Sequence, residues 1–138
     1  MPTLTIELRK QVVAPQLTHP LVQRVWRAVQ RQVTVPQRWQ QVSVVVVGDT
    51  AMKRLNQRYR HSATVTDVLS FPYGADGGEV VVCYPQAKRQ AASKQVSVRS
   101  ELAWLLTHGL LHILGYDHEL AKDANVMRPL EQRILQYV

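Results

Sequence analysis

The sequence is poor in several features that define particular classes of protein. It has one cysteine, Cys83, so an internal disulfide and a disulfide-stabilised scaffold are excluded. No segment reaches the roughly eighteen consecutive apolar residues that a transmembrane helix needs. The N-terminal stretch MPTLTIELRKQVV lacks the apolar region and the cleavage site of a signal peptide. We therefore expect a soluble, cytoplasmic protein that has no membrane partner.

Carboxylates are missing from two long stretches of the chain. Residues 8–48 and 80–100 contain no Asp or Glu, although they carry six and four Lys or Arg residues respectively. The net charge is +7 and the pI is near 10. A basic surface attracts polyanions because binding releases their counterions, so nucleic acid is the leading candidate partner. A solvated basic face with no partner is the alternative.

The pattern of apolar residues predicts one α+β domain spanning residues 1–138. The 138 residues are enough for a single core, and no linker or internal repeat divides them. The expected strands cover 3–9, 41–47, 66–72 and 79–83, and the expected helices cover 18–33, 49–58, 85–95, 98–114 and 123–136. We expect one small mixed β-sheet covered by about five helices. Pro129 opposes the last helix, because proline lacks the backbone donor that a helix interior uses.

Histidine is concentrated in one apolar segment, THGLLHILGYDHEL, at residues 107–120. Three of the five histidines lie there, at positions 108, 112 and 118. Residues four apart lie on the same face of a helix, so His108 and His112 are placed to share one cation. Gly115 is suited to ending that helix, and His118 can then turn back as a third ligand. This spacing predicts a metal site at the end of a central helix.

The chemistry of three imidazoles favours a catalytic zinc site. Zinc prefers four ligands, and a site with three protein ligands leaves one position open. We expect one Zn²⁺ per chain, while Ni²⁺, Co²⁺ or Mn²⁺ remain alternatives because three imidazoles discriminate weakly between divalent metals. Cys83, within the apolar strand EVVVC, is expected to be a small buried residue, not a fourth ligand. The simpler alternative is that these are ordinary helix and turn histidines.

The spacing H-x-x-x-H-x-x-G-x-x-H is also the ligand framework of the metzincin peptidases. Those enzymes carry a glutamate as general base directly after the first histidine, and this sequence has Gly109 there. A small metallopeptidase is therefore a disfavoured alternative. Asp117 and Glu119 are candidates to replace the base, although a hydrogen bond to a ligand and a surface charge are the simpler roles for them.

Several motifs along the chain resemble the YbeY family of bacterial ribosome-maturation endoribonucleases. The strongest is HGLLHILGYDH at 108–118. Supporting motifs occur in the same order as in the family: LNQRYR (55–60), TDVLSFPY (66–73), GGEVVVC (77–83), AKRQA (87–91) and ELAWLLTHG (101–109). The likeness covers nearly the whole chain and is weakest after His118.

The resemblance implies a metal-dependent endoribonuclease that cuts single-stranded RNA. It implies that His108, His112 and His118 bind the metal and that Arg60, in the matching YR position, is required for catalysis together with His108. It also implies a role in 3′-end maturation of 16S rRNA and in ribosome quality control, with no role on DNA. A non-enzymatic ribosome assembly factor with a structural metal remains an alternative. The general base and the oligomeric state stay open.

Secondary roles are assigned to other polar and aromatic residues. Asp67 is a candidate to hold a ligand imidazole, with a strand-end hydrogen bond as the simpler role. Trp104 and Leu105 are expected in the core, and His19 and His61 on the surface. Basic and aromatic residues that are candidates to follow a single RNA strand are Arg54, Arg58, Lys88, Arg89, Lys94 and Arg99, with Tyr59 or Tyr73 for base stacking.

Overall fold

The computed structural model describes residues 4–116 and 121–138. In these residues four strands and five helices follow one another as β1 (Ile6–Lys10), α1 (His19–Gln32), β2 (Gln41–Val47), α2 (Asp49–Arg60), β3 (Val68–Pro72), β4 (Gly77–Cys83), α3 (Tyr84–Lys94), α4 (Val98–Ile113) and α5 (Ala121–Leu135). The predicted α+β class with one mixed sheet and five helices is confirmed.

The four strands form a sheet in the order β1-β2-β4-β3. β1, β2 and β4 are parallel, and β3 pairs antiparallel with β4. β2 is central, and its valines alternate between the two faces of the sheet. Val42, Val44 and Val46 join the main core, whereas Val45 and Val47 join a smaller cluster on the opposite face. Burial on both faces explains why this strand is almost continuously apolar.

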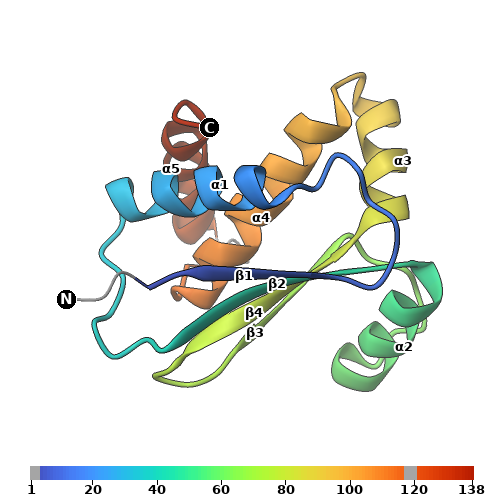
Figure 1. Cartoon of the computed structure of the whole chain (residues 1–138), viewed down its shortest axis with the longest axis horizontal. Helices are drawn as coiled ribbons and strands as arrows, with labels where there is room; N and C mark the ends of the chain where they lie inside the picture. The colour runs from blue at the N-terminus through green and yellow to red at the C-terminus, as the bar shows by residue number, and fades with distance from the viewer. Residues whose placement is uncertain (1–3, 117–120) are drawn as a thin grey trace.

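Helices cover the two faces of the sheet unequally. Figure 1 shows α1, α4 and α5 gathered on one side of the sheet, where the main core lies, with α2 on the other side. The smaller cluster is built around Met52 of α2 and the buried Leu69 of β3. α4 is the central helix, because it contacts α1, α3, α5, β3 and β4.

α4 approaches the sheet closely because glycine occupies its contact points. A Cβ at Gly109 would lie 2.7 Å from Cγ1 of Val80, and one at Gly78 would lie 2.6 Å from Cγ2 of Ile113. Ser70 of β3 also donates a hydrogen bond to the carbonyl oxygen of Gly109, at 2.9 Å. These contacts therefore fix the distance between α4 and the strands β3 and β4.

α5 runs as one helix through Pro129, so the proline does not end it. Proline removes the N–H that would bond to the carbonyl four residues earlier, here Asn125. Both Asn125 and Pro129 are exposed, so water can satisfy that carbonyl. The buried residues Met127, Leu130 and Ile134 hold the opposite face of the helix against the core.

The predicted element boundaries are close to the observed ones. Thr18 caps α1 by accepting from the Leu21 N–H, as its position predicts, and Ser97 caps α4 in the same way. α2 begins at Asp49, where the helix is expected, and Gly48 occupies its N-cap position without a side-chain hydrogen bond. Within the described residues, no helix combines the length and apolar character that crossing a membrane requires.

Candidate active site

A cleft of about 780 Å³ opens along α4, between β3 on one side and α5 on the other. We call it the α4 cleft. Its lining residues come from the end of α2, the segment just before β3, β3 itself, α4 and α5. The lining residues are Arg60, Thr66, Asp67, Val68, Leu69, Ser70, Pro72, Trp104, His108, His112, Arg128, Glu131, Gln132 and Leu135.

His108 and His112 project from adjacent turns of α4 into this cleft. Their Nε2 atoms are 3.1 Å apart, and the ring planes are inclined at 75°. Two nitrogens that bind one tetrahedral cation at about 2.0–2.1 Å are separated by roughly 3.3 Å. The observed separation therefore fits one edge of a coordination tetrahedron.

The third predicted ligand, His118, lies outside the described residues, as do Asp117 and Glu119. Among residues 4–116 and 121–138, no group of three His, Cys, Asp or Glu side chains is arranged to hold a metal ion. The described part of the chain thus contributes the histidine pair, and the predicted site requires His118 to complete it.

Arg60 lines the same cleft from the end of α2. The local fold explains its position: His61 adopts a left-handed conformation that ends the helix, and its N–H donates to the carbonyl of Gln57. The buried Asn56 side chain then donates to the carbonyl oxygen of Thr64, at 3.0 Å, and holds the segment that follows. Arg60 and the two histidines are 48 residues or more apart in the sequence, yet they share one cleft.

The His108 ring has two further neighbours in the cleft. Oε2 of Glu131, on α5, lies 3.3 Å from Nδ1 of His108. Trp104 stacks on the same imidazole, with ring centroids 5.0 Å apart and planes inclined at 23°. Leu105 is fully buried as predicted, whereas Trp104 packs on the core with one side and lines the cleft with the other.

Glu131 and Arg128 are cleft residues that the sequence analysis missed. A signal for Glu131 is present in MRPLEQRIL, where it falls on the apolar face defined by Met127, Leu130 and Ile134. A carboxylate at a core position of a helix needs a partner, so it points to a polar site. Arg128 is exposed, and nothing in its spacing distinguishes it from other surface arginines.

Asp67 makes strand-end hydrogen bonds. Its Oδ1 accepts from the N–H of Val68 at 2.7 Å, and its Oδ2 accepts from Nε2 of Gln90 at 3.1 Å. Asp67 also lines the α4 cleft. In the described structure its side chain makes no hydrogen bond to His108 or His112. The simpler of its two predicted roles is the one observed.

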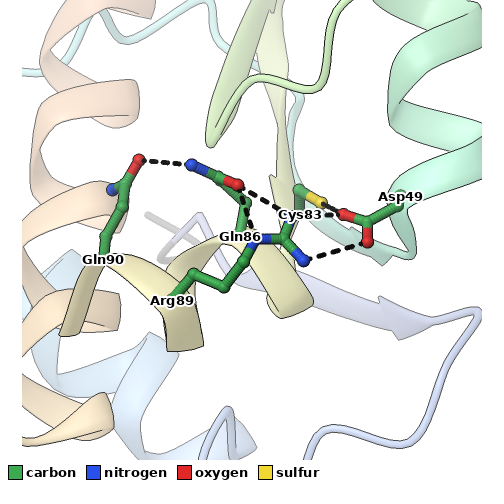
Figure 2. Close-up of polar contacts among 5 residues, drawn as sticks. All are labelled: Asp49, Cys83, Gln86, Arg89 and Gln90. Carbon is green, nitrogen blue, oxygen red and sulfur yellow. Dashed lines mark hydrogen bonds and ion pairs between the residues drawn. The ribbon is translucent and has the colours of Figure 1, made fainter. Parts of the chain in front are cut away.

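A chain of polar contacts along α3 connects Asp67 to Asp49 at the start of α2. From Gln90 the chain continues through Gln86 to Arg89, whose guanidinium donates two hydrogen bonds to Asp49 (Figure 2). The Arg89 guanidinium holds the pKa of the Asp49 carboxyl below its usual value. Arg89 thus forms an exposed ion pair between α3 and α2, and it does not line the α4 cleft.

Cys83 lies at the end of β4 beside Asp49, to which its Sγ donates at 3.4 Å (Figure 2). Burial raises the pKa of this thiol from 9.0 to about 11. The thiol therefore stays protonated at neutral pH and is a poor nucleophile and metal ligand. This agrees with the structural role predicted for it.

The predicted basic groove differs from the observed cleft. None of the six Lys and Arg residues proposed to follow an RNA strand lines the α4 cleft, and neither do Tyr59 and Tyr73. Lys94 pairs with the buried Glu101, at 2.8 Å, and its ammonium lies over the Trp104 ring. The described cleft contains Arg60 and Arg128 as its cationic residues. His19 and His61 are exposed, as predicted.

Comparison with known proteins identifies the family of this chain. The family model described as "Endoribonuclease YbeY" matches residues 4–138, nearly the whole chain. The chain belongs to the YbeY family. The sequence resemblance carried by the histidine segment and its supporting motifs is therefore confirmed.

Individual YbeY relatives match with different coverage. The protein named Endoribonuclease YbeY from Thermodesulfovibrio yellowstonii is 43% identical over 102 residues, and the match covers 68% of this chain and 64% of that protein. One of the same name from Nitrosococcus oceani is 29% identical over 142 residues, covering 96% of this chain and 93% of its own length. The match to the Myxococcus xanthus relative spans only 35% of that protein.

A solved structure has the same fold. The solution structure of a Thermotoga maritima protein superposes with a TM-score of 0.70 at 26% identity, covering 96% of this chain and 88% of that one. This chain thus shares its α+β architecture with an experimentally determined structure.

Proposed function

We propose that this protein is a metal-dependent endoribonuclease that cuts single-stranded RNA in the α4 cleft. The observation that carries the proposal is the convergence of His108, His112 and Arg60 on one cleft from separate parts of the chain. Membership of the YbeY family and the basic charge of the chain support the same conclusion.

Phosphodiester cleavage needs an activated nucleophile and compensation of the charge that develops on the phosphoryl oxygens. His108 and His112 would hold a divalent cation, Zn²⁺ being our first choice, together with His118. When bound, such a cation activates a nucleophile at neutral pH and polarises a phosphoryl oxygen. The nucleophile is water or the 2′-hydroxyl of the RNA, and the chemical ends of the product distinguish the two.

Arg60 would bind the scissile phosphate. A guanidinium stays charged at all relevant pH values and offers two parallel N–H groups to two phosphate oxygens. Its position at the end of α2, on the rim of the cleft that holds the histidines, allows contact with a phosphate beside the metal site. Arg60 would thereby orient the backbone and offset the charge of the transition state.

We further propose that the substrate in the cell is the 3′ region of 16S rRNA, in the cytoplasm, and that the protein acts in rRNA maturation and ribosome quality control. This proposal depends on family resemblance. An assembly factor with a structural metal is the second candidate from the sequence. The peptidase alternative is disfavoured further, because Gly109 packs against Val80 and leaves no room for a catalytic side chain at that position.

The test compares His108→Ala with His19→Ala in metal loading and in cleavage of matched single- and double-stranded RNA. His19 is exposed and has no second histidine four residues away, so it is not a predicted metal ligand. Its variant therefore shows the effect of removing a histidine outside the site. We expect His108→Ala to lose metal and to lose cleavage of single-stranded RNA by at least about a hundredfold. His19→Ala should behave as wild type, and double-stranded RNA should resist both.

Undiminished cleavage by His108→Ala would contradict the proposal and would indicate a contaminating nuclease. A wild-type protein that binds metal and ribosomes but cuts no RNA would favour the assembly factor. Turnover of casein by the metal-loaded protein would favour the peptidase.

A further inference from the structure

Glu131 is a buried carboxylate whose partner is unusual. Its side chain is 6% exposed, and within the described residues its side-chain polar contact is with the imidazole of His108, not with Lys or Arg. The buried Glu101, by comparison, pairs with the ammonium of Lys94. A buried carboxylate costs several kcal/mol when it lacks a good partner, so its retention on α5 calls for a specific reason.

The contact determines which nitrogen of His108 carries the proton. An ionised carboxylate only accepts hydrogen bonds, so Nδ1 must be the donor across the 3.3 Å separation from Oε2. A neutral imidazole protonated at Nδ1 has its lone pair at Nε2. That lone pair lies on the side of His112, whose Nε2 is 3.1 Å away.

Glu131 stands behind the ring, not beside the cation. It approaches Nδ1, on the opposite side of the imidazole from the nitrogen that faces His112. Among the described residues it forms no three-ligand group with the two histidines. Trp104 meanwhile covers one flat face of the same ring. The ring is thus restrained at its edge and at its face.

We propose that Glu131 is a positioning residue of the metal centre. By accepting a hydrogen bond from Nδ1–H of His108, it keeps the Nε2 lone pair of that ring directed at the cation site beside His112. Carboxylates that hold ligand histidines in this way orient the ring and raise its basicity, and their loss weakens metal binding by about 10- to 100-fold. The inference rests on the proposed function, because it presupposes a cation held by His108.

This role also explains why α5 belongs to the site. The helix supplies Glu131 from its buried face, two residues after a proline that would be expected to disturb it. The packing of Met127, Leu130 and Ile134 against the core sets the position of α5 and therefore the reach of the carboxylate.

The test measures Zn²⁺ affinity by competition with a chromophoric chelator for wild type, Glu131→Gln and Glu131→Ala. We expect Glu131→Ala to bind Zn²⁺ about 10- to 100-fold more weakly. Glu131→Gln should lose less, because its amide oxygen still accepts a hydrogen bond but carries no charge. Glu101→Ala is the matched control: it removes another buried carboxylate and should leave Zn²⁺ affinity within about threefold of wild type.

A second readout needs no metal. Nitrogen-15 chemical shifts of His108 in the metal-free protein at pH 8 report which ring nitrogen carries the proton. We expect Nδ1–H in wild type and a mixture of tautomers in Glu131→Ala, with no change in Glu101→Ala. A residue that only stabilised the fold would alter thermal unfolding without changing this tautomer.

Wild-type Zn²⁺ affinity together with an unchanged His108 tautomer in Glu131→Ala would overturn this inference and leave the proposed function standing. Failure of the wild-type protein itself to bind Zn²⁺ would overturn both. If Glu131→Ala does not fold, Glu131→Gln replaces it in the test. A Zn²⁺ affinity of Glu131→Gln equal to that of wild type, together with an Nε2–H tautomer of His108 in wild type, would contradict the role assigned here.

Discussion

Single side chains in the α4 cleft have separable roles, which follow from what each one contacts. His108 and His112 present nitrogens to a common point, Glu131 lies behind one of those rings, and Arg60 lines the rim. Under the proposed function, loss of a histidine ligand, of Glu131 or of Arg60 should therefore change different measurements. Metal content reports on the first two roles, and turnover of metal-loaded protein reports on the third.

Arg60→Ala should lower the rate of RNA cleavage by about 10²- to 10³-fold, because it removes donors aimed at charge that develops in the transition state. Arg60→Lys should recover only part of that rate, since an ammonium keeps the charge but loses the two-pronged contact. Both variants should retain wild-type metal content, measured by elemental analysis.

Arg54→Lys is the matched control for this prediction. It changes an exposed arginine on the same helix that does not line the cleft, so its rate should equal that of wild type. Full activity of Arg60→Ala would contradict the role given to Arg60.

Elements, in contrast, determine how close the functional side chains come to one another. α4 lies directly on β3 and β4 because Gly109 and Gly78 offer no side chains at the contact. Residues of β3, α4 and α5 line the cleft together. The spacing between helix and sheet therefore controls the position of the histidine pair relative to Arg60.

Gly109→Ala provides a test in which two effects have opposite signs. Helix propensity alone predicts stabilisation by about 0.5–1 kcal/mol for glycine to alanine in a helix. The new Cβ would meet Cγ1 of the fully buried Val80, a branched side chain with little freedom to move. We expect overpacking to prevail, with destabilisation of about 1–3 kcal/mol in urea unfolding.

The double variant Gly109→Ala/Val80→Ala tests whether the clash with Val80 causes the destabilisation. Removal of the valine methyls should relieve the clash, so the free-energy changes of the two single substitutions should not add. A more stable Gly109→Ala single variant would show that α4 does not depend on this close contact.

Across the whole molecule, the proposed function makes net charge the property that should control association with RNA. The net charge of +7 favours association with any polyanion, while the cleft itself contributes Arg60 and Arg128. Each phosphate contact on single-stranded RNA contributes about −0.7 to the slope of log K against log salt. Phosphate contacts by Arg60 and Arg128 would thus give the smallest slope that we expect, and other basic residues would make it steeper.

Binding of single-stranded RNA to metal-free protein, in the presence of chelator to prevent cleavage, should show a slope of about −1.4 or steeper between 50 and 200 mM salt. Fluorescence anisotropy of a labelled oligonucleotide measures this directly. A slope near zero would contradict phosphate contact by these arginines.

Much of the fold could be predicted because its determinants are local. The continuous β-branched run at 41–47 gives β2 at those residues, and Thr18 and Ser97 begin α1 and α4 where expected. The helix predicted at 123–136 continues through Pro129 because the face that carries the proline is exposed, and that exposure is a property of packing.

The sequence by itself determined the histidine pair, because residues four apart on a helix must lie on one face whatever surrounds them. It also determined the class of fold, through the periods of its apolar residues. Only the tertiary structure decided that Glu131 stands behind His108, that Arg60 and Arg128 line the same cleft, and that Arg89 and Lys94 are occupied by carboxylates. These contacts join different elements, and their positions depend on how α2, α3, α4 and α5 pack, which no local pattern encodes.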